Sequence, residues 1–434
     1  QKIFEISEAD ETEIFISKSK HALTRFANNY IHQNVDNESN SIRIRTIIGK
    51  KTASASTNSF TENALKKTLA NAIDATKLQH ENQKLLPLLP AQEYKPKDNF
   101  SEATKNFTAK KRAEMVSKAV TLCKKNKMEA SGIFSNFLQE FAIANSNGLF
   151  AYDRSTETEF SITAIDGIAS GWNEILRKDV NDVDVEKSAM IAIEKANLSK
   201  YPNKIDPGKY DVILEPAAVA EIIMFLLWKG FNGMDYMEGT SFLKANLNKK
   251  VFSDNFSIID DPFDQEITCQ PFDYEGSPIQ KVILVEKGIP KNFVTNRWIA
   301  KQTGVENNCH AIPLPQQGAY PFAMSVKNGT SSLNKMIENS SKAILVTHFH
   351  YSNLIDPMEL VITGMTRDGL FLVEDGKISK PLKNMRFTDS VLKIFSNIEE
   401  ISQNREFAGG FFGGGFLVPA MKISNFNFSS STEF

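Results

Sequence analysis

The segment Glu215–Ser241 reads E-P-A-A-V-A-E-I-I-M-F-L-L-W-K-G-F-N-G-M-D-Y-M-E-G-T-S, and it decides the predicted fold. Pro216 suits the first position of a helix, where its missing N–H would have no partner in any case. Between Ala217 and Trp228 the only charged residue is Glu221, and both helix faces are apolar. A helix that is apolar all round is buried on every side. The segment therefore predicts a helix in the middle of a core.

Composition and charge restrict the class of protein. The 434 residues are enough for two or three domains. The net charge of −2 comes from 50 basic and 52 acidic residues spread along the chain, which disfavours a dedicated nucleic-acid binder. Three cysteines without C-x-x-C spacing fit free thiols in a reducing compartment. The longest apolar run is shorter than the roughly 20 residues of a bilayer span. We expect a cytoplasmic protein that binds neither nucleic acid nor membrane.

Hydrophobic periodicity predicts an α+β fold in three parts. We expect an N-terminal α+β subdomain in 1–90, a middle α+β subdomain in 91–205 and a C-terminal β-rich domain in 206–434. The first two parts are expected to hold small sheets with helices, from strands at 12–18, 22–35, 41–57, 130–137, 141–145, 149–152 and 156–165 and helices from Thr61, at 108–127 and at 183–196.

The third part is expected to be mainly antiparallel sheet around the central buried helix. Its predicted elements are strands at 210–214, 256–259, 279–286, 322–326, 343–351, 359–363, 370–373 and 416–423, and a last helix at 391–401. Gly49-Lys50, between two alternating runs in the first part, predicts a hairpin turn.

Several motifs resemble the TldD/PmbA family, and the resemblance extends over nearly the whole chain. Thr24–Asn29, with the hairpin and helix that follow, is similar to the family's N-terminal domain. Asp273–Pro278 resembles D-x-E-G-x-P. Thr363–Ile378, followed by Pro381, resembles G-x-T-R-x-G-x-F-x-I-E-x-G-x-I-x-x-P. Each motif alone is modest, and it is their order and spacing together that indicate the family.

The resemblance implies a role in peptide hydrolysis. In the TldD branch, His-Glu-x-x-x-His on the helix that enters the C-terminal domain and a Cys near the C-terminus bind a zinc-type metal. The TldE/PmbA branch lacks these ligands and pairs with TldD in a heterodimer that degrades or trims peptides. The family's older description as a modulator of DNA gyrase has no support in the charge or motifs of this chain.

The chain departs from the metal-binding pattern. Counted back from Gly239-Thr240-Ser241, Met224, Phe225 and Lys229 fall at the His-Glu-x-x-x-His positions, and none of them is a normal zinc ligand. Segment 411–415 contains only Phe and Gly, so the C-terminal Cys is missing as well. We therefore predict a TldE/PmbA-like subunit without a cofactor of its own. Zinc is expected only in a TldD-like partner, and without that partner the chain would form a homodimer.

Other residues leave alternatives open. His348 and His350 would point to one face of a strand, either as two metal ligands or as ordinary hydrogen-bonded side chains. Glu221 is either a general base with a raised pKa or a carboxylate favoured by the helix dipole. Asp273 and Glu275 are weak catalytic candidates that could face a groove, although acidic residues before a glycine more often form a turn.

Thr240, Ser241 and Arg367 lie in family-like segments and are candidates for lining a peptide groove, although Ser241 is more simply a loop or cap residue. The glycine-rich segment 409–415 lacks a phosphate-loop pattern and indicates close backbone packing or a mobile flap. Two other functions compete with the metal-less subunit. One is a self-sufficient hydrolase that uses His348 and His350, and the other is a non-catalytic homodimer that binds peptide.

Overall fold

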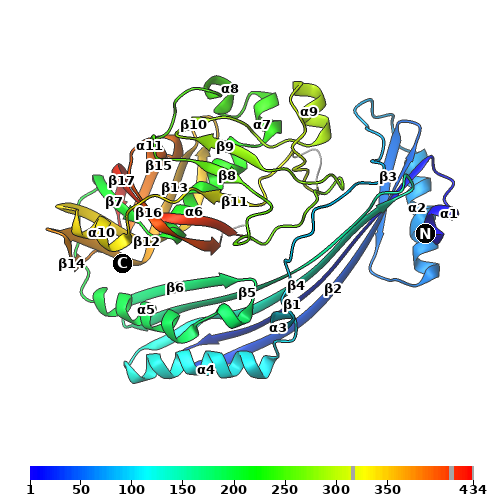
Figure 1. Cartoon of the computed structure of the whole chain (residues 1–434). Helices are drawn as coiled ribbons and strands as arrows, with labels where there is room; N and C mark the ends of the chain where they lie inside the picture. Colours follow the sequence, from blue (N-terminus) through cyan, green and yellow to red (C-terminus); the bar gives the residue numbers. More distant parts are fainter. Residues whose placement is uncertain (314–317, 410–414, 433–434) are drawn as a thin grey trace.

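The computed structural model describes residues 1–313, 318–409 and 415–432, and it consists of two sheet-based halves (Figure 1). A long curved sheet with helices beneath it forms the first half, and the second half lies above that sheet. The predicted α+β class is confirmed. Most of the glycine-rich segment, 410–414, lies outside the described residues, so its predicted use stays a prediction. No helix in the described parts of the chain has both the length and the apolar character to cross a membrane.

The first half is built on one six-stranded antiparallel sheet with the order β3-β2-β1-β4-β5-β6. Its strands are β1 (Glu11–Ala27), β2 (Tyr30–Ile48), β3 (Lys51–Thr57), β4 (Glu129–Asn145), β5 (Phe150–Asp166) and β6 (Ala169–Arg177). Its helices are α1 (Lys2–Glu5), α2 (Glu62–Lys77), α3 (Glu102–Lys105), α4 (Ala109–Lys125), the short η1 (Val180–Asp182) and α5 (Val185–Leu198). The small sheets expected from the sequence are joined into one, because β1 pairs with both β2 and β4 along most of its length.

Turn residues and strand pairing explain where the predicted strands of this sheet agree with the structure and where they differ from it. The hairpin at Gly49-Lys50 is confirmed between β2 and β3. The single strand predicted over 22–35 was wrong, because Asn28 and Asn29 adopt left-handed φ angles of 50° and 67° and turn the chain between β1 and β2. Within 130–165 the structure contains fewer breaks between strands than the sequence predicted. β4 and β5 are each continuous, since pairing with neighbouring strands satisfies the backbone through their polar stretches.

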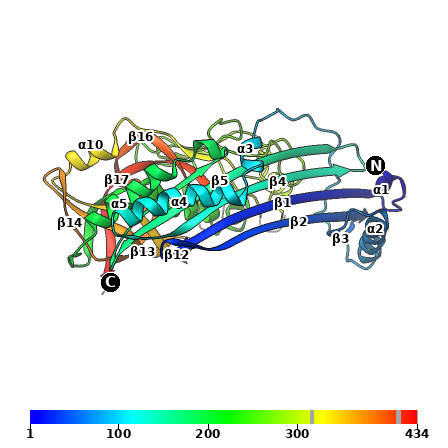
Figure 2. The ribbon, with the colours of Figure 1, turned by 90° about the horizontal axis from the view of Figure 1, so that it is seen from below.

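Helices α4 and α5 lie side by side against one face of this sheet (Figure 2). The buried core between them is formed by aromatic residues of the strands and small residues of the helices, including Phe26, Phe134, Phe160, Val116, Ala119, Ala189 and Ala192. Gly171 of β6 allows the closest approach, because a Cβ atom there would lie 2.2 Å from the carbonyl oxygen of Ala192.

The second half contains an eleven-stranded sheet and the predicted central helix. Its strands are β7 (Gly208–Leu214), β8 (Ile258–Asp260), β9 (Val282–Glu286), β10 (Ile289–Pro290), β11 (Met324–Val326), β12 (Lys342–Asp356), β13 (Val361–Glu374), β14 (Lys377–Pro381), β15 (Met385–Ser390), β16 (Ile398–Gly409) and β17 (Gly415–Ser431). The helical segments are α6 (Pro216–Phe225), the π-turn η2 (Leu226–Gly230), α7 (Gly233–Glu238), α8 (Leu243–Asn246), α9 (Arg297–Thr303), α10 (Leu333–Glu338) and α11 (Val391–Ser396). Pairing is mainly antiparallel, and the β7–β12 and β11–β17 pairs are parallel.

The predicted burial of the central helix is confirmed. Residues 218–220 and 222–225 are at most 2 % exposed and belong to one large core with side chains of β7, β12, β13 and β17. Because β17 pairs with β7 as well as with β15, the strands β17, β15, β13, β12 and β7 close into a ring of pairings beside the helix. The α-helix ends at Phe225, and the π-turn that follows it ends at Gly230. Trp228, on an apolar face that the sequence predicted to be buried, is 37 % exposed on this turn.

Two further predictions in this half were wrong. The separate strands at 359–363 and 370–373 form the single strand β13, which continues through a bulge at Asp368 and Gly369 with φ angles of 52° and 135°. The helix predicted at 391–401 ends at Ser396, and β16 begins at Ile398, where pairing with β17 takes over.

Gly171→Ala tests the packing of α5 on the first sheet. The added methyl group would meet backbone atoms of α5, so we expect the free energy of unfolding to fall by about 1–3 kcal/mol. Gly208→Ala is the matched control, because its added Cβ atom would meet only the Tyr210 ring at 3.6 Å. Urea unfolding should show a change of no more than about 0.5 kcal/mol for that control. Equal stability of the two variants would contradict the close packing at Gly171.

Candidate functional site

The end of the central helix carries a network of polar residues. The Nζ atom of Lys229 lies 3.3 Å from Oδ1 of Asp235, and the Thr240 hydroxyl donates to the same oxygen at 3.1 Å. The Ser241 hydroxyl donates to the carbonyl oxygen of Gly230 at 2.6 Å. The structure therefore brings three predicted site residues together. Sequence analysis missed Asp235, and an acidic residue six positions after a lysine was the signal that could have identified it.

The three residues that we predicted at the His-Glu-x-x-x-His positions do not fit a zinc ion. Met224 and Phe225 are each 2 % exposed and belong to the core. A thioether is a soft ligand that suits other metals better, and a phenyl ring offers no ligand atom. Lys229 is held by Asp235, and its ammonium group has no lone pair to donate. Throughout the described residues, no three His, Cys, Asp or Glu side chains are grouped as metal ligands.

The backbone around this position is nevertheless closely specified. The π-turn η2 spaces hydrogen bonds five residues apart, a geometry that occurs frequently at functional sites. A Cβ atom at Gly230 would lie 2.8 Å from the Phe242 ring, and one at Gly233 would lie 2.5 Å from the Val294 carbonyl oxygen. The segment from α6 to α7 thus has little freedom to rearrange, although its side chains differ from a metal site.

Asp273 and Glu275 organise the loop between β8 and β9. Fully buried Asp273 accepts backbone N–H groups of Glu275, Ser277 and Ala311 at 2.9–3.0 Å. Burial and the neighbouring Glu275 carboxylate raise the pKa of Asp273, and these three donors oppose the rise. Glu275 accepts the backbone N–H of Arg297 at the start of α9 at 3.1 Å. Of the roles left open by the sequence, these contacts support the turn, because both carboxylates accept backbone N–H groups.

The two histidines on β12 make separate contacts. His348 lies with Nε2 3.2 Å from Oδ2 of Asp368, and its ring stacks on Trp172 of β6 with the centroids 4.3 Å apart. His350 Nε2 lies 2.8 Å from Nη1 of Arg367. Burial, Arg367 and His348 lower the pKa of His350. The structure therefore places both histidines and Arg367 in one neighbourhood, at the junction of the two halves, and their use as metal ligands stays a prediction.

Glu221 is the only charged residue of α6, and it faces β12. Burial raises its pKa, and the neighbouring Ser352 hydroxyl opposes the rise. This environment suits a proton-accepting group in principle. A catalytic role of Glu221 stays a prediction.

Three carboxylates on the first sheet escaped the sequence analysis. Glu157 and Glu159 of β5 and Glu174 of β6 all have raised pKa values, mainly because burial disfavours their charged forms. Oε2 of Glu174 accepts the backbone N–H of Gly409 on β16 at 3.2 Å, so this residue contacts the second half. Burial and Glu159 raise the pKa of Glu174 to about 7. In the sequence, these three glutamates are ordinary polar positions of alternating strands. Only the tertiary structure distinguishes them from other polar residues.

Comparison with known families identifies the chain. Models of the PmbA/TldA metallopeptidase domain 1, central domain and C-terminal domain match residues 12–76, 100–200 and 207–430. The chain belongs to the PmbA/TldA metallopeptidase family. The family membership that the sequence motifs predicted is therefore confirmed. The match over 207–430 includes the central helix and the Lys229–Asp235 pair.

The chain is similar to several proteins at low sequence identity. The uncharacterized protein MJ0231 of Methanocaldococcus jannaschii is 26% identical over 309 residues, which cover 70% of this chain and 72% of that protein. The metalloprotease TldD homolog of Buchnera aphidicola subsp. Acyrthosiphon pisum is 21% identical over 354 residues, 74% of this chain and 72% of that protein. The crystal structure of TldE from Thermococcus kodakarensis shares the fold, with a TM-score of 0.88 at 22% identity over 96% of both chains.

Asp273→Ala tests whether this carboxylate supports structure. The substitution leaves three buried N–H donors without their acceptor, so we expect a loss of at least about 3 kcal/mol in the free energy of unfolding. Asp254→Ala is the control, because the Asp254 side chain is 94% exposed. Chemical denaturation would show no more than about 0.5 kcal/mol of change there. A similarly small change for Asp273→Ala would rule out the structural role.

Glu174→Gln tests the pH dependence of the contact between the halves. The folded-state pKa of about 7 lies above the value of about 4.3 in an unfolded chain. The folded state therefore holds the proton more tightly, and stability is lost as pH rises from about 4 to about 7 and is not regained above that. Glutamine cannot lose a proton, so the variant should gain up to about 3 kcal/mol relative to wild type between pH 4 and pH 8.

Unfolding curves at several pH values provide the measurement for Glu174→Gln. Exposed Glu8, changed to Gln, serves as the control for loss of a carboxylate in general. If the two variants show the same pH dependence relative to wild type, burial of Glu174 does not control its protonation.

Proposed function

We propose that this chain is a TldE/PmbA-like subunit that holds no catalytic zinc, in a peptidase system whose metal is carried by a TldD-like partner. The observation that supports this most strongly is the ion pair of Lys229 with Asp235 at the position where the family's second histidine is expected. A lysine ammonium repels a divalent cation. Peptide hydrolysis would then take place at the partner's metal, and this chain would shape the space around it in the cytoplasm.

The polar network at the end of α6 gives this subunit a defined role. Asp235 accepts from both Lys229 and Thr240, and the backbone N–H groups of Thr240 and Ser241 donate to the Asp235 carbonyl oxygen at 2.9 and 3.2 Å. These contacts hold η2 and the start of α8 in one arrangement without a metal. We infer that the network replaces a bound ion as the element that stabilises the segment and keeps its surface fixed for a partner or peptide.

Zinc content and co-purification test the proposal. The full chain would be co-expressed with a TldD-like protein that carries His-Glu-x-x-x-His, and both the heteromer and each separate chain would be purified. We expect a stable heteromer with one zinc ion, close to none in this chain alone, and peptide hydrolysis only when the partner is present. Zinc would be measured by atomic emission, and hydrolysis with a fluorogenic peptide.

Three variants make the assignment specific. Replacing the first His of the partner's motif with Ala should remove both zinc and hydrolysis, whereas Lys229→Met in this chain should leave the zinc content unchanged. His348→Ala combined with His350→Ala should leave hydrolysis by the heteromer intact. Stoichiometric zinc in the isolated chain would contradict the proposal. Hydrolysis by the isolated chain that depends on His348 and His350 would favour a self-sufficient enzyme.

A further inference from the structure

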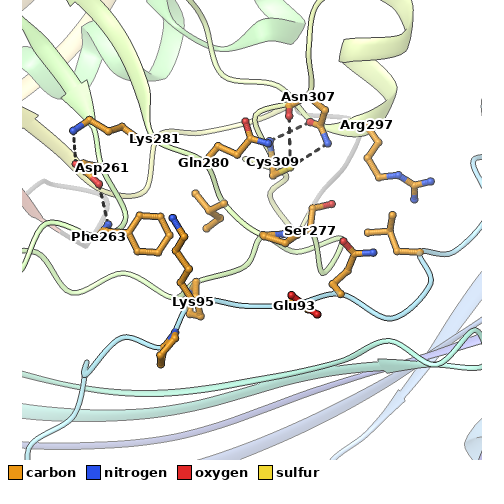
Figure 3. Close-up of a pocket in the computed structure, with 16 residues that line it drawn as sticks. Glu93, Lys95, Asp261, Phe263, Ser277, Gln280, Lys281, Arg297, Asn307 and Cys309 are labelled. Carbon is orange, nitrogen blue, oxygen red and sulfur yellow. Dashed lines mark hydrogen bonds and ion pairs between the residues drawn. The ribbon is translucent and has the colours of Figure 1, made fainter.

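A cleft of about 950 Å³ lies between the connector 86–99 and the second half of the chain (Figure 3). One wall is formed by the connector, and the other by the loop that Asp273 organises and by the segments around Phe263 and Asn307. Its volume is in the range of about 300–1,000 Å³ that is typical of ligand sites. The cleft is separate from the polar network of Lys229, none of whose residues lines it.

The connector is held in place at several points, although it has almost no regular secondary structure. Its Pro87 carbonyl oxygen accepts from Nη1 of Arg297 at 2.9 Å, and the Tyr94 hydroxyl donates to the Gly276 carbonyl oxygen at 2.7 Å. Lys97 Nζ donates to the carbonyl oxygens of Pro262, Asp264 and Ile267 at 2.5–2.9 Å. Because these contacts bracket residues 88–96, that stretch is a fixed wall of the cleft.

The lining combines an apolar surface with a few polar groups. Its apolar part comes from Leu89, Pro96, Phe263, Pro271, Pro278 and Ile279. Side-chain amides of Gln92 and Gln280 lie beside it and can serve peptide N–H and C=O groups. The Asn307 amide is instead bonded to Thr295 and Cys309. Sites with a mainly apolar lining and few polar groups bind ligands that have an apolar body and a small number of polar anchors.

Five charged residues line the cleft, namely Glu93, Lys95, Asp261, Lys281 and Arg297. The guanidinium of Arg297 donates to the Pro87 carbonyl oxygen of the connector. Lys281 Nζ is neutralised by Asp261 at 2.7 Å. Lys95, in contrast, makes no ion pair within the described residues, and its Nζ lies 4.8 Å from the centroid of the Phe263 ring. Figure 3 shows the Lys95 side chain extending from the connector into the cleft beside that ring. An ammonium group beside an apolar surface favours a ligand whose carboxylate is close to an apolar side chain.

We propose that this cleft binds a short peptide segment, with an apolar side chain against Phe263 and Ile279 and a carboxylate at Lys95. The carboxylate is the C-terminus of the peptide. This binding does not rest on the proposed role as a metal-less subunit, because the cleft is formed within one chain and its ligand can be tested without a partner.

Isothermal titration of the full chain with matched peptides tests the proposal. The probes are N-acetyl-Leu-Phe-Leu with a free carboxylate, the same peptide as its C-terminal amide, and N-acetyl-Gly-Gly-Gly with a free carboxylate. We expect the acid of the apolar peptide to bind at least about tenfold more tightly than its amide, because a charge-assisted hydrogen bond is lost in the amide. The glycine peptide should bind at least about tenfold more weakly than the apolar acid, because it has no side chains to bury.

Variants locate the binding in the cleft. Lys95→Glu should abolish the preference for acid over amide, and Lys111→Glu on the surface of α4 makes the same charge change elsewhere and should keep it. Gln280→Trp places a bulky ring at the cleft and should weaken both apolar peptides. Lys95 and Gln280 are exposed, so folding should tolerate both changes. Equal affinity for acid and amide, no binding at millimolar peptide, or identical behaviour of the Lys95 and Lys111 variants would overturn the proposal.

Discussion

Burial of α6 on every side is the constraint on which the second half of the chain depends. An apolar helix of this kind is stable only where other elements cover its apolar faces, and β12, β16, β17 and α11 are among the elements that contact α6. β7 leads directly into the helix, which places Pro216 at its first turn. At the other end the π-turn brings Trp228 and Lys229 towards the surface. The same packing that buries the helix therefore fixes where its polar end emerges.

The two halves are joined by a second set of contacts that depends on buried polar groups. Asp273 shapes the loop between β8 and β9, and Glu275 accepts a backbone N–H group at the start of α9. The connector is bonded to this loop through Tyr94 and to α9 through Arg297. On the first sheet, Glu174 contacts Gly409. Buried polar groups of this kind specify a single arrangement, because each loses its partner if the halves shift. The cleft beside the connector is a consequence of these contacts.

Local signals in the sequence predicted much of the fold. The absence of charge in α6, the Gly49-Lys50 turn and the alternation of the long strands each reflect short-range chemistry. The joining of β1 to both β2 and β4 and the bulge at Asp368 could not be predicted in this way, because they depend on pairing between distant segments. For the site, the sequence showed a lysine, Lys229, at a position where the family resemblance led us to expect a metal ligand. The partner Asp235 and the cleft required the three-dimensional structure.

This member of the PmbA/TldA family has a π-turn after its central helix, and Lys229 of that turn forms an ion pair with Asp235. The most direct measurement is anomalous scattering at the zinc edge from crystals of the heteromer with a TldD-like partner. We expect one zinc peak, on the partner's helix, and an intact contact between Lys229 and Asp235 in this chain. A zinc peak within coordination distance of a side chain from α6, η2 or α7 would contradict it.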